Sequence, residues 1–158
     1  MLDWLLPPRI ANDYRGHKVA LWLFGAVILL KLAISVGSMF NGYQAASSAD
    51  GIPLKTYPRA AVQTVVSLFA LLGLLHLVIC LVCVVVLIRY RALVPFMFAL
   101  LIFEYVARRL ILLLMPIDGT NAAPGLAINL AILGVMVVGL VLSLRARSAV
   151  AAPRYSHS

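Results

Sequence analysis

Residues 65–88 read VVSLFALLGLLHLVICLVCVVVLI, a run without a charged side chain. At about 1.5 Å per residue, a helix made of this run crosses the roughly 30 Å hydrocarbon core of a bilayer. Basic residues lie on both sides of it, with Arg59 before the run and Arg89 directly after it. The run therefore predicts a transmembrane helix over residues 59–88. Such a helix is longer than one crossing needs, so we expect it to tilt or to protrude at one end.

The composition of the whole chain is typical of a membrane protein. Hydrophobic residues make up 64% of the 158 positions and charged residues only 11%, against roughly 25% charged in soluble domains. The formal net charge of +8 comes mostly from basic residues at the ends of apolar runs. That distribution is typical of membrane topology signals. We therefore expect membrane lipids as partners and no nucleic acid.

Three further apolar segments complete the predicted fold. They cover residues 19–40, 92–115 and 124–144, and each is long enough for one crossing. Because residues 89–91 leave little room between the second and third segments, we expect these two to form a tight antiparallel hairpin. The sequence thus predicts an all-α integral membrane protein, a four-helix transmembrane bundle over residues 19–144 with up-down-up-down order.

Basic residues outside the apolar segments predict the orientation. One side of the membrane would hold Arg9, Arg15, Lys18, Arg89, Arg91, Arg145, Arg147 and Arg154, and the other side only Lys55 and Arg59. By the positive-inside rule both termini are then cytoplasmic, N-in and C-in. We expect residues 1–18 to be a cytoplasmic or interfacial segment and residues 145–158 a basic, disordered tail. The expected location is a bacterial inner membrane.

A layer of polar residues recurs at a similar depth in the four predicted helices. The layer consists of Lys31, His76, Glu104, Arg108, Arg109 and Asn129. Counted from the cytoplasmic end of each helix, the first three lie thirteen positions in, at a depth of about 20 Å. Arg108 and Asn129 lie about one turn further out. An unpaired charge near the bilayer centre costs at least about 2.5–3.5 kcal/mol, so we expect these side chains to face one another.

Glu104 is the single acid of this layer. Arg108 follows it by four residues on the same helix face, and Lys31 is the natural partner from another helix. With Arg109 included, the layer carries an excess of positive charge. Two interpretations follow: polar contacts that hold a small bundle together or dock a partner subunit, or a pathway for a substrate or an ion.

His76, Cys80 and Cys83 form one stripe on the second predicted helix. A metal, haem or thiol-redox site is one interpretation of this stripe. One helix cannot surround a tetrahedral ion, and a single intramembrane histidine gives bis-histidine haem ligation only in a dimer. We favour a packing role for these small, polarizable residues, with Cys80 and Cys83 kept as a possible thiol pair. We expect neither a metal nor a cofactor.

The sequence contains no Gly-rich phosphate loop, no nucleophile elbow and no pair of catalytic carboxylates, so we assign no catalytic residue. The expected function is that of a non-enzymatic accessory or interaction subunit in a larger membrane assembly. Its partners would be other membrane-protein subunits or further copies of the chain. The alternative is a small transporter, or a binder of anions or lipid headgroups, with Glu104 as the titratable group. A membrane redox protein using haem or thiols is the third hypothesis.

Overall fold

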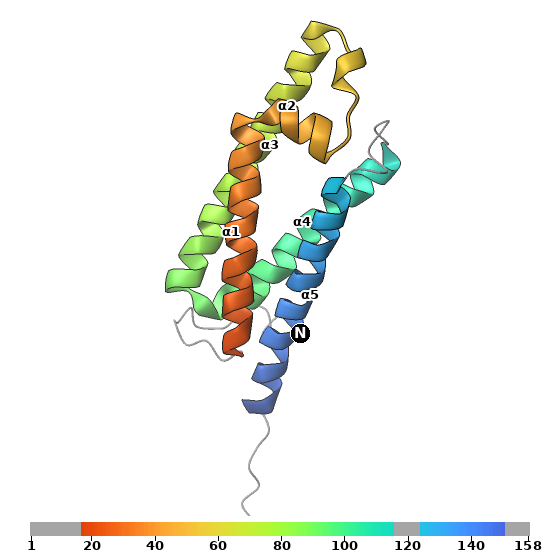
Figure 1. The fold of residues 1–158 in the computed structure, drawn as a ribbon. Coiled ribbons are helices and arrows are strands. Elements are labelled where there is room, and N and C mark those ends of the chain that lie inside the picture. Colours follow the sequence, from red (N-terminus) through yellow and green to blue (C-terminus); the bar gives the residue numbers. More distant parts are fainter. Residues whose placement is uncertain (1–16, 116–123, 151–158) are drawn as a thin grey trace, which may run out of the picture.

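The computed structural model describes residues 17–115 and 124–150, and in these ranges the chain is helical almost throughout and forms no strand (Figure 1). Its long helices are α1 (Lys18–Phe40), α3 (Arg59–Arg89), α4 (Val94–Leu114) and α5 (Pro124–Val150). The sequence predicts helices over 19–40, 59–88, 92–115 and 124–144. The differences lie mainly at the start of α4, where a 3-10 turn comes first, and at the end of α5.

Two predictions concern chain ends that fall largely outside the described ranges. They are the interfacial segment within residues 1–18 and the disordered tail within residues 145–158. The first part of that predicted tail is helical, because α5 continues to Val150. This extension contains alanine and arginine, both of which favour helix, and no glycine or proline.

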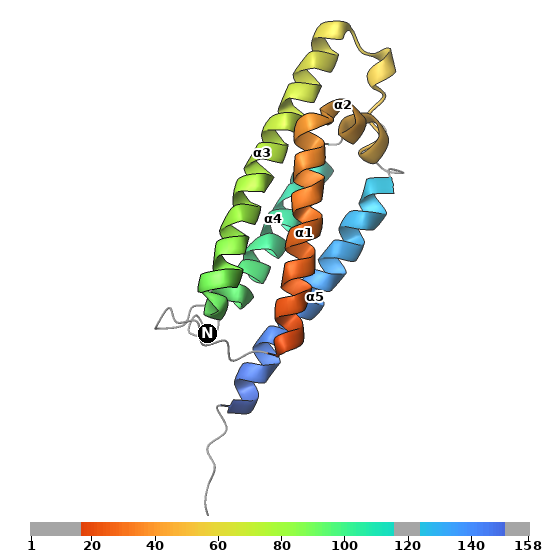
Figure 2. The same cartoon turned by 60° about the vertical axis from the view of Figure 1, so that its left-hand side comes forward.

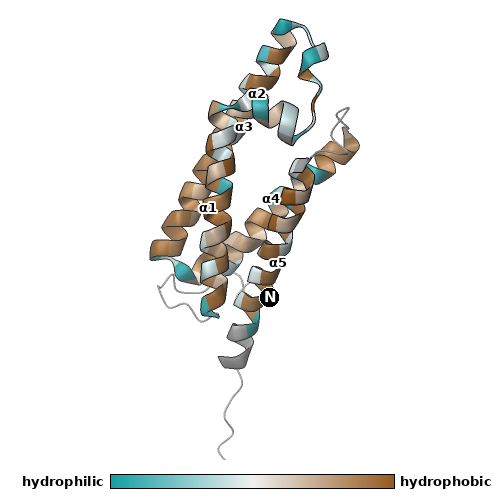
Figure 3. Cartoon of the chain, in the orientation of Figure 1, coloured by the Kyte–Doolittle hydropathy of each residue, from teal (hydrophilic) through white to brown (hydrophobic). Residues whose placement is uncertain are grey.

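Within residues 17–115 and 124–150, three helical segments are long and apolar enough to cross a membrane: α1, α3 and residues Gly125–Arg145 of α5. α4 has 21 residues, which is sufficient length, but it carries Glu104, Arg108 and Arg109. Figure 3 shows hydrophobic residues along the long helices and hydrophilic ones gathered near their ends and in the segment between α1 and α3. Large apolar side chains point outward, including Trp22 at 81% and Phe103 at 69% exposure. The described part of the chain is therefore all-helical and holds three candidate membrane spans.

α1 and α3 run side by side in opposite directions and form the most extensive helix pair (Figures 1 and 2). α5 packs against both α1 and α4. The connection from α3 to α4 is short, as predicted, with Tyr90 followed by a 3-10 turn at Arg91–Leu93. The two helices diverge from this connection instead of packing along their length, because α4 packs mainly against α5. The predicted tight hairpin is therefore open.

The segment between α1 and α3 is more ordered than the polar loop that the sequence predicts. It forms α2 (Gly42–Gln44), a π-helical turn (Ala45–Ala49) and a 3-10 turn (Leu54–Thr56). Its buried apolar residues pack against the first part of α3; they are Ala46, Ile52 and Leu54. The segment therefore covers one end of the helices with a small apolar cluster of its own.

The main apolar core lies toward the opposite end, near the connection between α3 and α4. Phe24 of α1 and Phe98 of α4 meet edge to face there, with ring centroids 4.9 Å apart, and Met136 of α5 is fully buried in the same cluster. Along each helix, the core residues occupy the part nearer this connection. The polar residues Lys31, His76 and Glu104 follow on the side toward α2, so they lie between the two apolar clusters.

Candidate functional site

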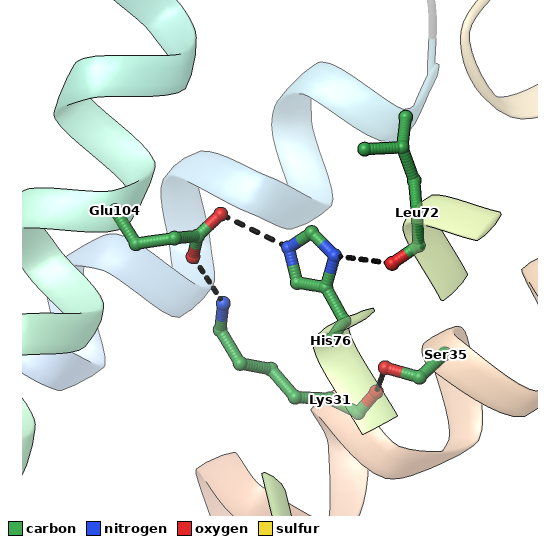
Figure 4. Close-up of polar contacts among 5 residues, drawn as sticks. All are labelled: Lys31, Ser35, Leu72, His76 and Glu104. Atoms are coloured by element: carbon green, nitrogen blue, oxygen red, sulfur yellow. Dashed lines mark hydrogen bonds and ion pairs between the residues drawn. The ribbon is translucent and has the colours of Figure 1, made fainter. Parts of the chain in front are cut away.

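The carboxylate of Glu104 joins three helices. One oxygen, Oε2, accepts a hydrogen bond from Lys31 Nζ of α1 at 3.1 Å, and the other, Oε1, lies 2.9 Å from His76 Nε2 of α3 (Figure 4). Glu104 itself belongs to α4, so residues far apart in sequence converge on one acid. We call Lys31, His76 and Glu104 the triad. Both oxygens of its acid are engaged by other helices.

Hydrogen bonds to the backbone accompany two members of the triad. His76 Nδ1 lies 2.9 Å from the Leu72 carbonyl oxygen in the preceding turn of α3. Ser35 Oγ donates to the Lys31 carbonyl oxygen at 2.7 Å, and the Ser35 side chain is buried in α1 (Figure 4). The contact with Leu72 fixes the direction of the imidazole ring, so that Nε2 points away from its own helix and toward α4.

The triad is mostly shielded from its surroundings. Its side chains retain 13% exposure at Lys31, 22% at Glu104 and 24% at His76. Electrostatic interactions strengthen when water is replaced by a medium of lower dielectric constant. A change in the charge of any triad member therefore strongly changes its electrostatic interactions with the other two.

A close approach of α1 and α3 brings two members of the triad together. A Cβ atom placed on Gly73 would lie 2.8 Å from the Ser35 carbonyl oxygen and 2.9 Å from the Met39 backbone nitrogen. Only glycine fits there, since these neighbours are backbone atoms that cannot rotate away. Gly73 is one turn before His76, so the contact holds α3 against the part of α1 that carries Lys31. We did not identify Gly73 from the sequence, although it is a small residue on the same stripe as His76 and Cys80.

The other predicted members of the layer lie outside the triad. Arg108 was expected to pair with Glu104, but both oxygens of that acid are engaged elsewhere; the guanidinium lies 6.0 Å from the centre of the Tyr105 ring. Arg109 is half-buried on α4, and Asn129 is half-buried on α5. In the part of the chain that the structure describes, neither takes part in the hydrogen bonds of the triad. The polar contacts therefore join three helices, whereas the sequence predicted four.

Arg108 interacts electrostatically with an acid that we did not single out from the sequence. Asp50 ends the π-helical turn between α1 and α3, outside the long helices. Burial raises the pKa of its carboxyl above the usual 3.8, and the positive charge of Arg108 partly opposes that rise. Nothing in the sequence predicts this relationship, because it depends on how the segment between α1 and α3 folds into short helical turns.

Cys80 and Cys83 are free thiols buried on the face of α3 that also carries Gly73. Cys83 belongs to the main apolar core, and Cys80 lies close enough to Lys31 and Glu104 to interact with their charges. Among the residues that the structure describes, no three His, Cys, Asp or Glu side chains are grouped so as to hold a metal ion. Both thiols are buried, and a packing role for them stays a prediction.

Comparisons with known protein families, with curated proteins and with solved structures find no match to this chain. The chemistry of the triad is therefore the basis for assigning a function. The arrangement can hold three helices together by charge-assisted hydrogen bonds, and it can bind or release a proton at the contact between the imidazole and the carboxylate.

Proposed function

We propose that this chain is a non-enzymatic accessory or interaction subunit of a larger membrane assembly, in which the triad sets the relative positions of the helices. One observation carries the proposal: both oxygens of Glu104 are bonded to groups from two other helices. The polar groups are thus directed at one another, while the outward surface of the helices is largely apolar. Such an arrangement suits a scaffold that presents apolar helix faces to lipid and to partner helices.

A topology accompanies this proposal. α4 crosses the membrane as a fourth span, giving an up-down-up-down bundle with both termini in the cytoplasm of a bacterial cell. Support comes from its length of about 31 Å over 21 residues, and from the partners that Glu104 finds within the protein. The unequal distribution of basic residues supports the orientation.

Cysteine labelling tests the topology. We expect a membrane-impermeant maleimide added to intact cells to label Thr56→Cys, which lies in the exposed 3-10 turn before α3. Ser156→Cys in the tail should react only after the membrane is permeabilised. The native thiols are buried, and the unmodified chain serves as the control. Labelling of Ser156→Cys in intact cells would contradict the proposed orientation.

Photo-crosslinking in the native membrane tests the interaction role. A photoreactive phenylalanine analogue at Phe103, which is 69% exposed on α4, should yield adducts with another protein chain. The same analogue at the fully buried Phe98 is the matched control and should crosslink only within the chain. Native mass spectrometry after gentle extraction gives the second measurement. A stable single chain of 17.1 kDa, with no adduct from Phe103, would contradict the proposal.

A second candidate is a small transporter, or a binder of anions or lipid headgroups. The observation in its favour is Arg108, which is exposed about one turn beyond Glu104 on a helix of membrane-spanning length. In this case Arg108→Gln should weaken binding to vesicles containing anionic lipid, or to inorganic phosphate. Glu104→Gln should abolish the pH dependence of binding or flux while the protein still inserts. Wild-type behaviour of both variants would eliminate this candidate.

A further inference from the structure

The contacts of His76 need one more hydrogen than a neutral ring can supply. Nδ1 lies 2.9 Å from the Leu72 carbonyl oxygen, and Nε2 lies 2.9 Å from Glu104 Oε1. A carbonyl oxygen and an ionised carboxylate both only accept hydrogen bonds, so each contact needs a hydrogen on the ring nitrogen. A neutral imidazole carries one such hydrogen. With a neutral ring and an ionised Glu104, one of the two contacts becomes a repulsion between lone pairs.

A different orientation of the ring does not remove this conflict. Turning the His76 ring over by 180° exchanges Nδ1 with Cδ2 and Nε2 with Cε1. Ring carbons would then face the two oxygens, and both hydrogen bonds would be lost. The observed orientation is the one that uses both nitrogens, so the missing hydrogen has to come from an added proton.

We propose that the triad is a binding site for one proton, held on the line between His76 Nε2 and Glu104 Oε1. The proton comes from water and returns to water on release. Bound, it makes either an imidazolium that donates to the carboxylate or a carboxylic acid that donates to the neutral ring. With the Lys31 ammonium, the triad then has a net charge of +1. Release lowers this charge to zero and leaves His76 with one of its two hydrogen bonds.

The charged surroundings of His76 come from each helix that packs near it. α4 contributes Glu104 directly and carries Arg108 and Arg109 further along, and α1 contributes Lys31. On α3 itself, the thiol of Cys80 lies in the next turn. The ionisable residues of α5 are Arg145 and Arg147, both near the C-terminal end of this helix. Glu104 is therefore the acid that can share the proton with His76.

The position of the triad links the proton to the contact between α3 and α4. α3 and α4 diverge from their short connection, and the contact from His76 to Glu104 bridges them at a distance from it (Figures 2 and 4). Loss of the proton forces the ring to give up either Glu104 or Leu72. In the first case the bridge between the diverging helices is broken, and in the second case the ring loses the contact that fixes its direction. This inference does not depend on what the chain assembles with.

Nuclear magnetic resonance of the full chain in nanodiscs tests the proposal, because the sequence allows single-site labelling. Glu104 is the only glutamate, and replacement of His17 and His157 by glutamine leaves His76 as the only histidine. With ring-¹⁵N histidine and carboxyl-¹³C glutamate, we expect a doubly protonated ring beside an ionised carboxylate, or an Nδ1–H ring beside a carboxylic acid, at neutral pH. Release of the proton should move both signals together. A neutral ring beside an ionised carboxylate at neutral pH would overturn the proposal.

Glu104→Gln is a matched variant in which the His76 ring should not hold the added proton. Its amide nitrogen can donate to His76 Nε2 while its oxygen still accepts from Lys31, so the added proton is no longer needed. We expect a neutral Nδ1–H ring at neutral pH. Asn129→Leu, which changes a residue outside the triad, should keep the wild-type spectrum. A doubly protonated ring that persists in Glu104→Gln at neutral pH would contradict the proposal, and the wild-type spectra decide it even where the variant does not fold.

Discussion

Gly73 of α3 lies directly against the backbone of Ser35 in α1, with only 2.8 Å between the Ser35 carbonyl oxygen and the place where a Cβ of residue 73 would be. Ser35 follows Lys31 by one helical turn, and Gly73 precedes His76 by nearly one turn. The contact therefore fixes the separation of the two helices beside the triad. Small residues allow such close approach between helices in membranes.

Replacing Gly73 by alanine should weaken the pairing of α1 with α3. The new methyl group would overlap backbone atoms, so the helices have to move apart, at a cost of about 1–3 kcal/mol in the free energy of unfolding. SDS titration of the protein in mild-detergent micelles measures this loss. Gly37→Ala is the matched control in α1, because nothing lies within 4 Å of a Cβ at that position. Equal stability of the two variants would mean that the close approach is not required.

Removing the acid of the triad should cost more than converting it to an amide. Glu104→Ala leaves the Lys31 ammonium and the His76 ring without their shared acceptor in a largely shielded place, and we expect a loss of about 3 kcal/mol. Glu104→Gln keeps a hydrogen-bonding group for each neighbour and should retain most of the stability. SDS titration of both variants at neutral pH makes the comparison. An alanine variant as stable as the glutamine variant would show that the triad does not hold the helices together.

The members of the triad could be predicted from sequence because helix geometry is nearly fixed. The rise per residue converts a count of thirteen positions into a common depth, and this brought Lys31, His76 and Glu104 to one level. The direction in which a side chain points around its helix could not be predicted. The long helices are apolar on every side, so no amphipathic pattern indicates which face is buried. For this reason Arg108 and Asn129 were expected in the polar contacts but lie outside them.

Contacts that depend on the distance between helices were also beyond prediction. Gly73 becomes informative only when the backbone of α1 is seen beside it. The open angle between α3 and α4 has a similar origin, since a short connection limits where two helices start but does not limit how they diverge. Asp50 approaches Arg108 because the segment between α1 and α3 folds into short helical turns, whose apolar residues are too few to give a periodic pattern.

Asp50 should make the stability of the protein depend on pH. Burial raises its pKa in the folded state above 3.8, so its carboxyl binds a proton more tightly when folded than when unfolded. Its contribution to stability is therefore fully present below the unfolded pKa and is lost as the pH rises through the folded pKa. Asp50→Asn should be more stable than wild type at neutral pH, and the difference should vanish at acidic pH.

Thermal unfolding in detergent across this pH range checks the effect of Asp50. Arg108→Gln removes the positive charge that partly opposes the rise in the pKa of Asp50. The pKa of Asp50 should therefore increase further, and the loss of stability should shift to higher pH. Lys55→Gln is the control, because it removes an exposed positive charge from the same segment. A constant difference between Asp50→Asn and wild type at every pH would contradict this prediction.

Gly139 of α5 should tolerate a larger residue as poorly as Gly73 does. Here the obstacle is a neighbouring side chain, whereas at Gly73 it is the backbone of α1. A Cβ at this position would overlap the ring of Phe98, which is fully buried between α4 and α5. Gly139→Ala should therefore lower the free energy of unfolding by about 1–3 kcal/mol. Gly134→Ala is the control on the same helix, because a Cβ there meets nothing within 4 Å.

A second substitution separates this steric effect from a general effect of alanine in α5. Phe98→Leu alone should destabilise the core by removing a buried ring, but it also makes space for the new methyl group of Gly139→Ala. The double variant should thus be more stable than the sum of the two single losses predicts, by about 0.5 kcal/mol or more. SDS titration of the wild type, the two single variants and the double variant gives the four stabilities that this comparison needs. Strict additivity would mean that Gly139 and Phe98 are not in direct contact, and that the packing of α4 against α5 differs from the one described.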